Sequence, residues 1–139
     1  MNAEAWTLLA CRSRALVHQV SLLMGALTHP VQSQDDAALG AIAMNATPTL
    51  NGLLAVMATA PELAAHQRTI QRFDMALAAW RRSVGESSPL APRYQTALLQ
   101  QAAQVVTTCL HVESLSASES ARVLVGRPDL GGRPGPPPP

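Results

Sequence analysis

Histidines and acidic residues are the side chains of this sequence that could do acid–base or metal chemistry, and their spacing forms no familiar site. No two of the four histidines are four residues apart, none has a cysteine or carboxylate at a spacing typical of metal sites, and no HExxH motif occurs. Asp35 and Asp36 are adjacent, which suits a helix start rather than paired catalytic carboxylates. The chain also lacks a GxSxG motif and a glycine-rich phosphate loop. We therefore expect a protein that is not an enzyme and that uses no cofactor or metal.

The two cysteines are Cys11 and Cys109, which lie far apart and form no CxxC motif. Free, buried thiols in a reducing cytosol are the expected state, and a single disulfide between them is the alternative. The predicted location of the protein is the cytoplasm.

Arginine supplies every positive charge, because the ten basic residues include no lysine. Genomic base composition explains this bias simply, and recognition of phosphate or carboxylate by forked guanidinium groups is the alternative. Arg68, Arg72 and Arg82 lie off the apolar stripe of a helix predicted over 61–85 and give it a basic outer face. This face is either solvated surface or a contact site for DNA phosphate or an acidic partner. A net charge of +1 argues against a protein that binds nucleic acid unaided.

Two apolar stripes with alternating steps of three and four residues define the helices that would position these side chains. Such spacing returns to one helix face every seven residues, so each stripe must be buried. An alanine-rich core with 3% aromatic residues is weakly held, and burial in a homo-oligomer would add stability. We therefore interpret the stripes as assembly seams, in which Ser13 and His66 would fix register. The first stripe is Trp6, Leu9, Ser13, Leu16, Val20, Leu23 and Leu27, and the second is Leu63, His66, Ile70, Phe73, Leu77, Trp80 and Val84.

The 139 residues, 47% of them apolar, predict an all-α fold: a compact bundle of about five to six helices. The helical domain should span 1–125, and the glycine- and proline-rich residues 126–139 should form a disordered tail. Thr47 and Pro48 resemble a cap and a first-turn proline, and Ser116 with Glu119 resembles a capping box. These signals divide the chain into helices expected over 3–27, 35–45, 47–60, 61–85, 93–112 and 116–125. In the fifth of these, the residues expected to face inward are Tyr94, Leu98, Val105, Cys109 and Val112.

The segment 37–61 carries no charge and is long enough to cross a bilayer. Polar residues and a proline between Asn45 and Asn51 would be costly in hydrocarbon. We expect a turn between two short helices there, and no contact with a membrane.

Two short runs between Val17 and Val106 stand out: Arg72, Phe73 and Asp74, and a threonine, an alanine and two leucines from Thr96. Together with smaller fragments they resemble the flagellar transcriptional regulator FlhD family, in which the first run is distinctive and the second resembles the following helix. The chain departs from the family where Ala37 and Ala38 replace part of a Met-Phe-Arg run. The resemblance implies an all-helical protein that dimerises, joins an FlhC-like regulatory subunit and activates flagellar or related transcription on DNA only within that complex.

The sequence thus supports two functional hypotheses of different classes. The first is an oligomeric FlhD-like transcriptional regulator that uses Arg68, Arg72 and Arg82 for phosphate or partner contact. Its assembly-seam residues would be Trp6, Leu16, Leu23, His66, Phe73 and Trp80. The alternative is a small helical adaptor or export-type chaperone that acts only by protein–protein interaction.

Overall fold

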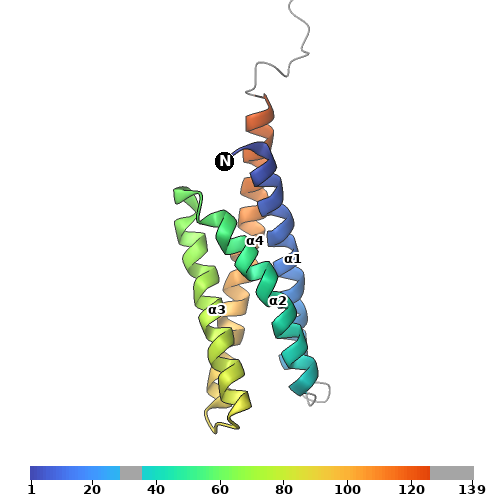
Figure 1. The fold of residues 1–139 in the computed structure, drawn as a ribbon, viewed down its shortest axis with the longest axis vertical. Coiled ribbons are helices and arrows are strands. Elements are labelled where there is room, and N and C mark those ends of the chain that lie inside the picture. Colours follow the sequence, from blue (N-terminus) through green and yellow to red (C-terminus); the bar gives the residue numbers. More distant parts are fainter. Residues whose placement is uncertain (29–35, 126–139) are drawn as a thin grey trace, which may run out of the picture.

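The computed structural model of the chain describes residues 1–28 and 36–125, which form four α-helices and one turn of 3-10 helix. Successive helices run in opposite directions, and α4, the longest, extends beyond the others beside the N-terminus (Figure 1). Helix α1 packs against α2 and α4, α3 packs mainly against α4, and α2 makes a smaller contact with α3. The elements are α1 (Ala3–Thr28), α2 (Asp36–Met57), η1 (Pro61–Leu63), α3 (Ala64–Gly85) and α4 (Ala91–Val125).

The all-α prediction is confirmed for the described residues, but the number of helices is four rather than five to six. One reason is that α2 continues through Pro48, where the sequence predicts a turn. Proline removes one helical hydrogen bond, yet its ring faces solvent here, and the hydroxyl of Thr47 donates to the carbonyl of Ala43 at 3.2 Å. Burial on both sides of the proline favours one continuous helix. The buried positions of this face are Ala43, Ala46, Leu50, Leu53 and Met57.

The second reason is that α4 continues through Ser116, so the predicted capping box is wrong. Ser116 is 1% exposed and extends the buried stripe of the helix, which places it in the core rather than at a helix end. Inward positions are confirmed for Leu98, Val105, Cys109 and Val112. Tyr94 is 38% exposed, so its predicted inward position is wrong: it lies in the first turn of α4.

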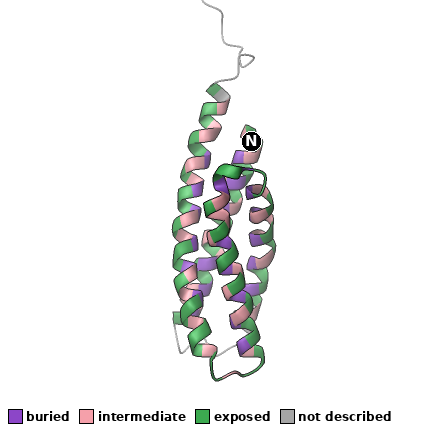
Figure 2. Cartoon of the chain, turned by 90° about the vertical axis from the view of Figure 1, so that its left-hand side faces the viewer, coloured by how far each residue is buried: buried purple, intermediate pink, exposed green. Residues whose placement is uncertain are grey.

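Both apolar stripes face the interior of the bundle, where Figure 2 shows the buried positions along the inner faces of the helices. All seven residues of the first stripe are buried. In the second, His66 and Val84 are half-buried, and Ser83 takes the buried place at the end of α3. The stripes therefore obtain their burial from the other helices of the same chain.

Polar contacts also tie α1 to its neighbours. Arg14 pairs with Glu113 of α4 at 2.6 Å, and the amide of Gln95 donates to the backbone carbonyl of Leu27 at 3.3 Å. A membrane-spanning length of apolar helix is not found among the described helices. The predicted tail, residues 126–139, lies outside the described residues.

Candidate functional site

The outer side of α3 carries an exposed row that we call the arginine face, formed by Arg68, Arg72, Met75 and Arg82. Steps of four, three and seven residues keep these side chains on one side of the helix. Met75 has 72% of its surface exposed and lies among the arginines. The exposed positions predicted for the three arginines are confirmed.

The arginine face is positively charged along most of its length. Among the described residues, the ion pairs are Arg14 with Glu113 and Arg122 with Glu119, so neither involves α3. At the end of the helix, Arg82 and Glu86 line the same small pocket of about 90 Å³. An acidic side chain therefore lies close to Arg82 at this end of the face.

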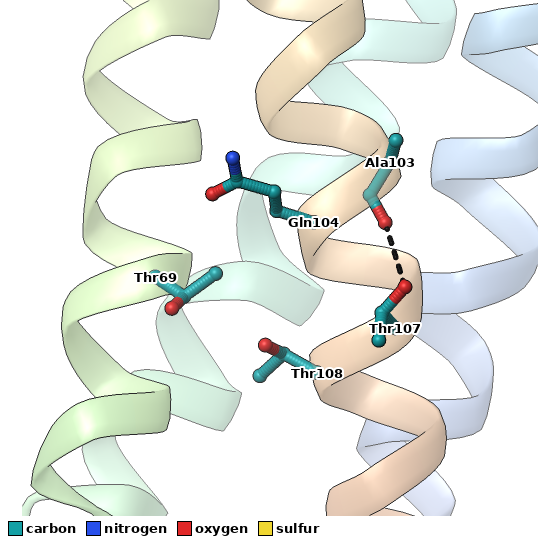
Figure 3. A pocket seen from close by; sticks show the side chains of 5 residues that line it. All are labelled: Thr69, Ala103, Gln104, Thr107 and Thr108. Atoms are coloured by element: carbon teal, nitrogen blue, oxygen red, sulfur yellow. Dashed lines mark hydrogen bonds between the residues drawn. The ribbon is translucent and has the colours of Figure 1, made fainter.

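A second feature is a shallow groove of about 360 Å³ between α3 and α4, which we call the threonine groove (Figure 3). Thr107 donates its hydroxyl hydrogen to the carbonyl of Ala103 at 3.2 Å, and Thr69 donates to the carbonyl of Ala65 at 3.3 Å. These two hydroxyls keep free lone pairs, but their hydrogens are already engaged in hydrogen bonds to the helix backbone. The threonine hydroxyls thus offer weak acceptors, the amide of Gln104 adds a donor and an acceptor, and no base lies among the lining residues to activate a hydroxyl as a nucleophile. Its lining residues are Thr69, Ala103, Gln104, Thr107 and Thr108.

Two histidines face each other across the same helix pair, one turn beyond the threonine groove. The ring centroids of His66 on α3 and His111 on α4 are 5.2 Å apart, with the ring planes tilted by 39°. Burial, and secondarily the neighbouring His111, lower the pKa of His66. The sequence singles out His66 as a seam residue and misses His111, because the pairing of α3 with α4 is not visible in either residue's local spacing.

Both thiols are free, as predicted, but burial is confirmed for Cys109 alone: Cys11 lies on the exposed side of α1, so its expected burial is wrong. Burial raises the pKa of Cys109 to about 12, and the carboxylate of Glu113 contributes further. Cys109 therefore remains a protonated core side chain at neutral pH.

The proposed seam residues occupy the interior of the single chain. His66 is half-buried, and the others are buried: Trp6, Leu16, Leu23, Phe73 and Trp80. Because their apolar surface is already covered, these residues offer little area to a second copy. In the described part of the chain, no group of three or more histidine, cysteine or acidic side chains is placed to hold a metal ion.

Comparisons of the chain with protein-family models, with curated proteins and with solved structures give no match. The resemblance to the FlhD family thus rests on the sequence fragments alone. Its distinctive run has three different environments in the fold: Arg72 is exposed, Phe73 is buried and Asp74 is half-buried. Core packing accounts for Phe73, which leaves Arg72 as the fully accessible member of the run.

Proposed function

We propose that this protein is a small helical adaptor or chaperone that binds an acidic segment of another protein through the arginine face of α3. The observation that carries the proposal is the exposed row of Arg68, Arg72, Met75 and Arg82 outside the ion pairs of the described residues. Unpaired guanidinium groups bind carboxylates in forked geometry, and they lose less on binding when no internal ion pair must break.

The composition of this face favours a protein partner. Arg68 and Arg82 are separated by fourteen residues, which corresponds to about 21 Å along a helix. An amphipathic helix of similar length can place carboxylates against the arginines and an apolar residue against Met75. Three phosphate contacts alone would give weak and strongly salt-dependent binding to DNA.

A second candidate is the FlhD-like transcriptional regulator, acting as an oligomer with an FlhC-like subunit on DNA. The observation that favours it is Arg72, which belongs to the distinctive Arg-Phe-Asp run and is exposed on the arginine face. In this case Arg68, Arg72 and Arg82 would contact phosphate or the partner subunit within the complex.

Charge reversal of the arginine face tests the adaptor proposal. The probe is an acidic amphipathic helical peptide, and binding is measured against the double variant Arg68→Glu/Arg72→Glu. The matched control is Arg81→Glu/Arg93→Glu, which reverses two exposed arginines outside the face and outside the ion pairs of the described residues. We expect at least a tenfold loss of affinity in the first variant and little change in the control. Since the two variants have the same net charge, this difference would depend on where the arginines lie and not on overall charge. Equal losses, or no binding by the parent protein, would overturn the proposal.

A salt titration of DNA binding separates the two candidates. It is carried out on the protein alone and on the protein co-expressed with the product of its neighbouring gene. The adaptor function predicts no DNA affinity in either case. DNA binding by the co-expressed complex that disappears in Arg68→Glu/Arg72→Glu would establish the regulator instead.

A further inference from the structure

The separation of the two histidine rings is compatible with a metal ion shared by two imidazoles. Zinc–nitrogen bonds are about 2.0–2.1 Å long, so a bound ion lies roughly 3 Å from each ring centre. Two rings at a tetrahedral angle around that ion would have centres roughly 5 Å apart. The ring centroids of His66 and His111 are 5.2 Å apart.

We propose that His66 and His111 form a two-histidine site for a divalent transition-metal ion, which links α3 to α4. Imidazole nitrogen is a preferred ligand of Zn²⁺, Ni²⁺ and Cu²⁺, and Cu²⁺ binds most tightly at a given nitrogen site. The site lies away from the arginine face, so it does not depend on the proposed function.

Both histidines are suited to this role. A metal ligand must be the neutral imidazole, and partial burial of His66, which lowers its pKa, favours that form at neutral pH. His111 is exposed, which gives an ion access from solvent and lets water complete its coordination. With two protein ligands the site requires no third histidine, cysteine or acidic side chain.

A metal ion at this position would stabilise the contact between the two helices. The ligands come from different helices, so the site is assembled only in the folded bundle and is absent from the unfolded chain. Binding to the folded state alone raises the melting temperature in proportion to the logarithm of the metal concentration. This linkage provides a readout that does not depend on the biological role.

The test is thermal unfolding of the full chain with Ni²⁺, compared with EDTA. All proteins carry Cys11→Ser, which removes the exposed thiol as a competing ligand. The variants are His66→Asn and His111→Asn, and the control is His18→Asn, an exposed histidine on α1. We expect Ni²⁺ to raise Tm by several degrees in the parent and the control, and this shift to be lost in both variants. Equal shifts in all four proteins would overturn the site.

Electron paramagnetic resonance of added Cu²⁺ gives a second readout. The parent should show coordination by two imidazole nitrogens, and each single variant should show at most one. Because His111 is exposed, His111→Asn is expected to fold normally, which keeps the test valid even where His66→Asn loses stability. Identical spectra for the parent and His111→Asn would exclude a shared ion.

Discussion

Arg12 of α1 donates a hydrogen bond from its guanidinium Nη1 to the backbone carbonyl of Gly52 on α2, at 2.8 Å. The side chain crosses directly over the glycine: a β-carbon at position 52 would lie 3.2 Å from Nη1. Because Gly52 has no side chain, the half-buried Arg12 of α1 can reach the backbone of α2. This contact fastens α1 to the C-terminal half of α2, a helix that has few contacts with α3.

Two glycine substitutions in α2 should separate helix propensity from this contact. Gly40→Ala meets no atom within 4 Å and should stabilise the protein by about 1 kcal/mol, the helix preference of alanine over glycine. Gly52→Ala receives the same gain but displaces the guanidinium, so its net effect should be smaller or negative. Urea unfolding measures both variants. An equal increase in unfolding free energy for Gly52→Ala and Gly40→Ala would show that the hydrogen bond from Arg12 contributes nothing to stability.

Ser116→Ala should stabilise the protein by about 1 kcal/mol. The hydroxyl oxygen of Ser116 is buried and has no hydrogen-bond partner, and alanine both removes this unsatisfied group and has a higher helix propensity. Ser114→Ala, at an exposed position of the same helix, is the control for propensity alone. Urea unfolding should show a larger increase in unfolding free energy for Ser116→Ala than for Ser114→Ala. The reverse order would indicate that the hydroxyl of Ser116 has a hydrogen-bond partner in solution.

The sequence predicts the core better than it predicts the helix boundaries. The first stripe, from Trp6 to Leu27, is buried as predicted because heptad-like spacing determines one helix face directly. Pro48 and Ser116 mislead because each is a local signal for a helix start. Buried residues on both sides of Pro48 outweigh that signal, and Ser116 is itself buried at the end of the inward stripe of α4. The pairing of His66 with His111 depends on which helices become neighbours, and no local pattern encodes that choice.

Trp80→Ala should cost about 3–5 kcal/mol of unfolding free energy, because it removes a large buried side chain and leaves a cavity. Trp80 is 3% exposed within the single chain, so the loss should appear at every protein concentration. Denaturant titrations at low and high micromolar protein concentrations measure the unfolding free energy of the parent and of Trp80→Ala. A cost that grows at the higher concentration, with a lower mass by size-exclusion chromatography, would instead place Trp80 in a subunit contact.

The two thiols should differ sharply in reactivity. Cys11 is exposed and should react with a thiol reagent in the native protein, whereas Cys109 is buried with a pKa raised to about 12. Labelling at neutral pH should therefore modify one thiol per chain in buffer and two in urea. The variant Cys11→Ser should show no native labelling, and rapid labelling of that variant would mean that α4 opens readily.

Stability should fall as the solution is acidified through the range in which His66 titrates. Its folded-state pKa is lowered, first by burial and then by His111, so the unfolded chain takes up a proton at a higher pH than the folded chain. The stability that comes from keeping His66 neutral is therefore fully present above the unfolded pKa of about 6.5 and is lost as the pH falls below it. Urea midpoints at pH 7.5 and 5.5, measured with EDTA to remove metal, should differ in the parent and in the control His18→Asn. His66→Asn should reduce that difference, and an unchanged pH dependence in this variant would assign the effect to other groups.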